Sequence, residues 1–207
     1  MVCVKKSLLT VLVLCICLSG CGTRAEESKE EALPIVYIGG SDRPYVFDYN
    51  SLEDGAQLIV KVTALEKTDQ QVRTTYLDWV DRYEPVSGGS YRKLLIDQVI
   101  KGDKELEGTD ITFLQECFDW EQDTHKGTEK VTYCYSGARP LEKGKQYILF
   151  LIPKKAESGE VMYYSKYDFQ GIYEYKEGKA VCCLNEGVEL NDLPYQEFAD
   201  ILNDLYQ

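Results

Sequence analysis

The sequence has very little histidine, and this scarcity removes most hydrolytic chemistry. His125 is the only histidine among 207 residues. A zinc site of the H-E-x-x-H type needs two histidines, and the sequence contains neither a G-x-S-x-G nor a Walker motif. A Cys-His nucleophile made from His125 with Cys117 or Cys134 is the remaining enzyme alternative. We expect a protein that is not an enzyme, with no catalytic residue, no metal and no bound cofactor.

Basic residues are also scarce relative to acidic ones. The chain has 23 Lys and Arg against 35 Asp and Glu, a formal net charge of −12. Proteins that bind nucleic acid through its phosphates carry an excess of positive charge. We therefore expect no nucleic-acid partner. We also expect the body of the protein to be repelled by anionic lipid and anionic wall polymers.

The sequence has no apolar run long enough to span a bilayer. Its most apolar stretch, residues 7–18, falls short of the roughly 20 residues that a spanning helix needs. Two lysines precede this stretch, and small residues ending in Gly20 separate it from Cys21. A charged start, an apolar centre and a small-residue end are typical of a secretory signal. An uncleaved anchor, or a plain secretory signal with a chance cysteine, is the alternative.

The motif Leu18-Ser19-Gly20-Cys21 resembles the lipobox of bacterial lipoproteins. The resemblance implies a signal peptide over residues 1–20, cleavage between Gly20 and Cys21, and a covalent diacylglycerol on the Cys21 thiol. An additional N-acyl chain, such as palmitate, is an option of the family. The polar residues 21–33 would then be a lipidated tether to the extracytoplasmic face of the cell membrane, since two acyl chains hold a protein stably at a membrane. The composition favours a Gram-positive source.

Four of the eight cysteines remain outside the leader and its lipid site: Cys117, Cys134, Cys182 and Cys183. The midpoint between Cys117 and Cys134 falls at a predicted hairpin turn near His125. The two cysteines could therefore form a cross-strand disulfide, and two buried thiols are the alternative. Cys182 and Cys183 are neighbours on one predicted strand, so they point to opposite faces. A zinc site built from these cysteines and His125 matches no known spacing.

Strand patterns dominate the remaining chain. Alternating or short apolar runs lie at residues 34–38, 57–66, 91–100, 110–117, 130–135, 146–152, 161–166, 171–175 and 179–184. We expect Pro153 to end the central strand. Apolar residues at helical spacing predict a closing helix over 194–206. The sequence therefore predicts a mainly β fold: one domain over residues 34–207, built as a small Greek-key, OB-like barrel or a sandwich with a C-terminal helix.

The order of several motifs supports this fold. LIVKV at residue 58, VIKG at 99, LEKG followed by QYILFL at 141, and GIY at 171 are similar to uncharacterised Gram-positive lipoproteins. Their domain looks like the OB-fold barrel found in tissue metalloprotease inhibitors. The resemblance covers about residues 57–184 and implies no catalytic residue. Residues 68–89 depart from the compact pattern, and we interpret them as an insertion.

An acidic stretch follows Cys117. Asp119, Glu121 and Asp123 imitate the start of a calcium-binding loop, but Thr124 occupies the position of the required glycine. We interpret this stretch as a solvated acidic loop.

Aromatic residues give the last signal. The possible binding surface consists of Tyr76, Trp79, Tyr83, Tyr91 and Trp120. Tyr and Trp are common in binding surfaces. However, the spacing of Tyr76, Trp79 and Tyr83 favours a short helix packed on the barrel. We expect a lipid-anchored, extracytoplasmic binding protein whose partner is a protein or another component of the cell envelope, bound through residues 68–89 and the neighbouring strand ends. A small-ligand or glycan receptor with an aromatic groove is the alternative.

Overall fold

The computed structural model describes residues 32–38, 55–124, 126–135, 138–156, 158–165, 168–182 and 193–204. The chain divides into two compact units, Met1–Glu31 and Ala32–Gln207, and every described residue belongs to the second. The predicted signal peptide and Cys21 therefore lie outside the described residues, as do most of the predicted tether, His125 and Cys183. In the part of the chain that is described, no helix is long and apolar enough to cross a membrane.

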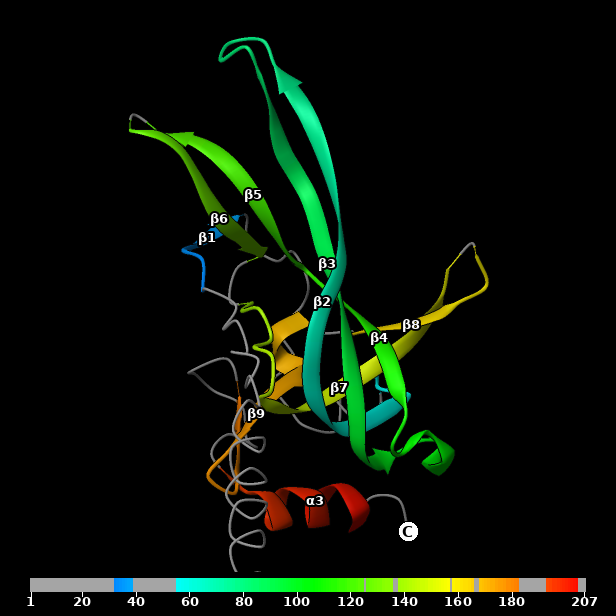
Figure 1. The fold of residues 1–207 in the computed structure, drawn as a ribbon. Helices are drawn as coiled ribbons and strands as arrows, with labels where there is room; N and C mark the ends of the chain where they lie inside the picture. Colours follow the sequence, from blue (N-terminus) through cyan, green and yellow to red (C-terminus); the bar gives the residue numbers. More distant parts are fainter. Residues whose placement is uncertain are drawn as a thin grey trace, which may run out of the picture. The chain divides into compact units, whose positions relative to one another are not determined.

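The described part is mainly β with one C-terminal α-helix, as the sequence predicts (Figure 1). Its elements are β1 (Ile35–Ile38), β2 (Leu58–Leu77), β3 (Arg82–Lys101), η1 (Lys104–Leu106), β4 (Asp110–Gln115), β5 (Cys117–Thr124), β6 (Gly127–Tyr135), β7 (Gln146–Lys155), β8 (Val161–Ser165), η2 (Asp168–Gly171), β9 (Ile172–Lys176), β10 (Lys179–Cys182), β11 (Leu193–Pro194) and α3 (Tyr195–Asp204).

Five strands close into a ring. β2 pairs with β3, β3 with β4, β4 with β8, β8 with β7, and β7 with β2. The β4–β8 pair is parallel and the other pairs are antiparallel. This strand order is that of a small Greek-key barrel of the OB type, so the predicted fold is confirmed. β9, β10 and β11 extend the sheet from β7, because β9 pairs with β7 at residues 146–149.

Two apolar clusters cover the two faces of these strands. Val60, Val62 and Leu149 belong to the first cluster, which fills the ring. The second cluster contains Phe150, Tyr173 and Phe198. Phe198 comes from α3, and its ring lies 5.2 Å from the ring of Tyr173. The closing helix therefore packs its apolar stripe on the second face of the sheet.

A second sheet has the order β1-β6-β5. β5 leaves the barrel directly after β4, and its residues 117–124 pair with residues 127–134 of β6. The expectation of an acidic loop at residues 119–123 is therefore wrong, because this stretch forms strand. The predicted turn near residue 125 is confirmed by the pairing of Thr124 with Gly127.

Two further expectations are corrected. Pro153 does not end the central strand, because β7 continues to Lys155. β2 pairs with β7 only as far as Leu151, so Pro153 lies where β8 alone pairs with β7 and its missing N–H costs no ladder bond. Residues 68–89 form no packed helix. They are the distal halves of β2 and β3, each 20 residues long, which run side by side to a turn (Figure 1).

Candidate binding surface on the β2–β3 hairpin

The distal part of the β2–β3 hairpin is a two-stranded ribbon. β7 pairs with β2 only up to Thr63, and β4 pairs with β3 only from Ser90 onward. Beyond these points each strand has a single described ladder partner, which is the other strand of the hairpin. A two-stranded hairpin is marginally stable by itself in water. The ribbon therefore depends on what packs against it.

We call Tyr76, Trp79 and Tyr83 the aromatic tip. Tyr76 and Tyr83 form a cross-strand pair with ring centroids 5.2 Å apart. Trp79 lies in the turn between them and is 80% exposed, whereas Tyr83 is 63% and Tyr76 45% exposed. Rings this large and this exposed at the end of a hairpin are uncommon in a soluble domain. The tip is therefore the strongest candidate for a binding surface.

The turn that carries Trp79 is locally ordered. The Val80 N–H donates to the Leu77 carbonyl oxygen over 3.1 Å, and Asp81 adopts a positive φ of 54°. The Tyr76 hydroxyl donates to the Asp81 carboxylate, and this hydrogen bond raises the pKa of Tyr76 above its ordinary value. The turn thus fixes one aromatic side chain of the tip in place.

Two charged residues of β3 flank Tyr83 of the aromatic tip. Arg82 and Glu84 flank Tyr83 and form an ion pair with each other. Both influence Tyr133 of β6, whose pKa is raised first by burial and then by the charge of Glu84, while the charge of Arg82 lowers it.

The second sheet supports the ribbon through a close apolar contact. Phe118, Val131 and Tyr133 form a buried cluster, against which Val72 of β2 packs. Opposite Val72 stands Gly88, where a Cβ atom would lie 2.6 Å from Phe118 Cδ1. Only glycine admits the Phe118 ring at this distance. The Gly88–Phe118 contact therefore holds the two hairpins together.

A polar network lies beside that contact. The side-chain amide of Gln70 donates to the Asp119 carbonyl oxygen over 3.0 Å, and its oxygen accepts from the Asp119 N–H over 3.0 Å. The carboxylate of Asp119 accepts from Lys67 Nζ at 2.7 Å and from Thr132 Oγ1 at 2.9 Å. Gln70 thus imitates a strand partner for Asp119, and the predicted acidic loop is tied to β2.

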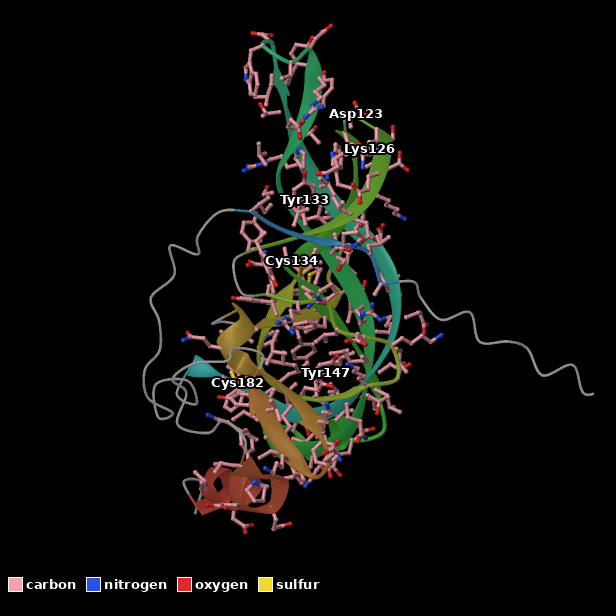
Figure 2. All side chains as sticks on the ribbon, turned by 90° about the vertical axis from the view of Figure 1, so that its left-hand side faces the viewer. Asp123, Lys126, Tyr133, Cys134, Tyr147 and Cys182 are labelled. Carbon is pink, nitrogen blue, oxygen red and sulfur yellow. A yellow bond between two sulfur atoms is a disulfide. The ribbon has the colours of Figure 1, made fainter. Side chains whose placement is uncertain are left out.

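Cys117 and Cys134 lie directly opposite each other on β5 and β6, with Cα atoms 4.3 Å apart, and they form a disulfide. Both are buried together with Ala138. Cys182 is buried in the second core cluster, away from this bond (Figure 2). The disulfide therefore crosslinks the hairpin that supports the ribbon.

The other aromatic candidates lie elsewhere. Tyr91 is half-buried in the barrel, where it pairs with Leu114 of β4. Trp120 is half-buried and packs against the Phe118 cluster. The structure thus brings together three of the five predicted residues and leaves these two out. In the described ranges no group of three or more His, Cys, Asp or Glu side chains could hold a metal ion.

Sequence reasoning missed the contacts that join the ribbon to the second sheet. The contact between Gln70 and Asp119 carries no sequence signal, because it joins residues that are 49 positions apart. The Gly88–Gly89 pair did carry a signal, since glycine inside a strand often marks a close approach of another chain segment. Searches of protein-family models, of curated proteins and of solved structures each found no match to this chain.

Proposed function

We propose that this protein is a lipid-anchored, extracytoplasmic binding module that contacts a protein of the cell envelope through the aromatic tip. The observation that carries the proposal is the exposure of Trp79 and Tyr83 at the end of the β2–β3 hairpin. Tyr and Trp are enriched where proteins bind one another, because each presents a large rigid surface with a polar end.

The position of the tip supports a binding role. The β2–β3 turn connects the first two strands of the barrel ring. In OB-type barrels this connection is one of the loops that hold ligands. An oligonucleotide ligand is disfavoured here, because the chain carries a net charge of −12.

The shape of the tip favours a protein over a glycan. A receptor for a small ligand or a glycan surrounds its ligand with a concave site. Trp79 instead lies in a turn and is 80% exposed. A side chain that protrudes in this way suits a pocket on the surface of a larger partner. The lipid anchor supports the same proposal through the Leu18–Cys21 motif. It would keep the module next to envelope proteins and raise its effective concentration there.

Photo-crosslinking in living cells tests the proposal. A photoreactive amino acid replaces Trp79 or Tyr83 in one set of cells and Val161 in another. Val161 is a matched control, because it is 47% exposed but belongs to β8. We expect a discrete adduct from the two tip positions that protease digestion removes, and no such adduct from Val161. Equal adducts from all three positions, or a tip adduct that survives protease and is lost with glycosidase, would contradict the proposal.

A further inference from the structure

The two outer edges of the distal ribbon differ. On β3, Pro85 pairs with Thr74 of β2 and Ser87 pairs with Arg73 of β2. Val86 between them has no partner in β2 and forms a bulge. Proline and bulges are the devices by which edge strands avoid pairing with other chains. On β2, every residue of 69–77 has a partner in β3 and none is skipped. The β2 edge is therefore regular, whereas the β3 edge is blocked.

No described strand adjoins the β2 edge along residues 69–77. β7 ends its pairing with β2 at Thr63, and the following backbone bonds reach only Ala64. β5 comes near this part of β2, but Asp119 bonds the side chain of Gln70 and not the β2 backbone. A regular edge of this kind is a template for a further strand.

The charges along the β2 edge are complementary to themselves. Asp69, Gln71 and Arg73 alternate along the strand, so they share one face, and all three are exposed. If a second copy pairs antiparallel about a two-fold axis at Gln71, each Asp69 lies opposite an Arg73 of the other copy. Opposite charges directly across a strand pair stabilise it, and a two-fold axis makes the contact twice. Arg73 has no ion-pair partner within the described residues.

One other symmetric register would place an acid opposite a base. It centres on Thr68 and sets Asp69 opposite Lys67. However, Lys67 is already bound to Asp119 at 2.7 Å within its own chain. Between the two registers, the charge pattern therefore selects the one about Gln71.

We propose that two copies of this chain associate through the outer edges of β2, antiparallel and about a two-fold axis at Gln71. The ribbon of each copy then gains a third strand, which supplies the support that an isolated two-stranded hairpin lacks. The aromatic tips of the two copies point in opposite directions along the paired strands. The axis at Gln71 lies five positions before Tyr76 on β2, and the association does not depend on the partner proposed above.

Cysteine crosslinking of the full-length chain in intact cells tests the symmetry. A residue on the two-fold axis lies opposite the same residue of the second chain. Gln71→Cys should therefore give a disulfide-linked dimer on a non-reducing gel. Thr75→Cys is the matched control, because it lies on the same strand and the same face. In the proposed register the residues at position 75 of the two chains are about 27 Å apart, because eight strand positions of roughly 3.4 Å each separate them. We expect several-fold more dimer from Gln71→Cys, and equal dimer from both variants would overturn the proposal.

Charge exchange in the Gln71→Cys background tests the pairing itself. Asp69→Arg sets an arginine side chain opposite Arg73 of the other copy and should reduce the dimer several-fold. Adding Arg73→Asp restores opposite charges and should restore the dimer, which also shows that the single variant did not merely unfold. The register is wrong if Asp69→Arg leaves the amount of dimer unchanged. It is also wrong if the double variant is folded, with its internal Cys117–Cys134 disulfide intact, and still gives no more dimer than Asp69→Arg.

Discussion

At the scale of single residues, buried tyrosine hydroxyls should contribute to a loss of stability at alkaline pH. Tyr147 lies in the barrel core with 4% of its surface exposed, and its hydroxyl oxygen accepts from the Glu142 N–H over 3.0 Å. Burial raises the pKa of Tyr147 to about 12, and the hydrogen bond from Glu142 lowers it by less. The folded chain therefore holds this tyrosine neutral in a range where the unfolded chain ionises it.

We predict that Tyr147→Phe flattens the alkaline loss of stability. An unfolded tyrosine has a pKa of about 10, so between pH 10 and 12 only the unfolded state loses this proton. The contribution of Tyr147 to the free energy of unfolding is then complete below pH 10. It decreases by about 2–3 kcal/mol as the pH rises to 12, and above 12 it is lost. Urea titrations of both proteins from pH 8 to 12 measure the difference.

At pH 8 the same variant should lose about 1 kcal/mol, because the hydrogen bond to Glu142 is gone. Parallel curves for the two proteins across the alkaline range would show that Tyr147 does not titrate with folding. Burial also raises the pKa of Tyr195, where it is the largest cause. The Phe variant should therefore keep part of the alkaline loss.

A second residue-scale prediction concerns Gly88. Gly88→Ala places a methyl group 2.6 Å from Phe118 Cδ1 and 2.8 Å from the Gln71 carbonyl oxygen. The backbone oxygen cannot rotate away, so we expect a loss of about 1–3 kcal/mol in the free energy of unfolding, the usual cost of overpacking. Ser87→Ala, one position earlier on β3, is the control and should change little. A Gly88→Ala protein as stable as the control would mean that β5 does not pack closely on the ribbon.

At the scale of elements, aromatic side chains of the two hairpins divide into a buried group and an exposed group. Phe118 is fully buried between the hairpins, whereas Trp79 is 80% exposed. Trp79→Ala should therefore change the free energy of unfolding by less than about 0.5 kcal/mol. Phe118→Ala should cost about 3–5 kcal/mol. Thermal and urea unfolding of both variants measure these changes. A large loss of unfolding free energy in Trp79→Ala would show that Trp79 contributes to packing, which would contradict a role in binding alone.

The disulfide gives a prediction for the β5–β6 hairpin. It joins residues 17 positions apart, and closing a loop of that length stabilises a fold by about 3 kcal/mol. The double variant Cys117→Ala/Cys134→Ala should lose about this amount in a urea titration. Reductant should lower the stability of the parent to a similar level and leave the double variant unchanged. An equal response of both proteins to reductant would point to another disulfide.

The elements that could be predicted from sequence are those that bury a face. Val60 and Val62 alternate with polar neighbours because one side of β2 fills the barrel, and that alternation is visible in the sequence. The distal ribbon exposes both of its faces over most of its length, so it lacks this signal, and the chance spacing of Tyr76, Trp79 and Tyr83 suggested a helix. β5 was missed because Asp119 is neutralised by Lys67, a partner 52 positions away.

At the scale of the whole molecule, the proposed anchor determines where the aromatic tip can act. Cys21→Ser removes the thiol that would carry the acyl chains, and each buried CH₂ of such a chain contributes about 0.8 kcal/mol to membrane binding. We expect cells that make this variant to release it or keep it unanchored, whereas the parent sediments with membranes. Cys17→Ser, inside the predicted leader, is the matched control and should behave like the parent. A Cys21→Ser protein that still sediments with membranes would contradict the anchor.

The closure of the ring has a consequence for how the chain reaches its folded state. β8 joins β4 to β7, although it begins only at Val161 and follows β4 by some 50 positions. Until β8 pairs with both of them, β4 and β7 each keep an unpaired edge, so a chain truncated before β8 should be prone to aggregate. Such a topology also folds slowly, because distant segments must meet before any ring exists. β8 is therefore the strand that closes the ring, and the chain should be most exposed to aggregation before β8 has paired.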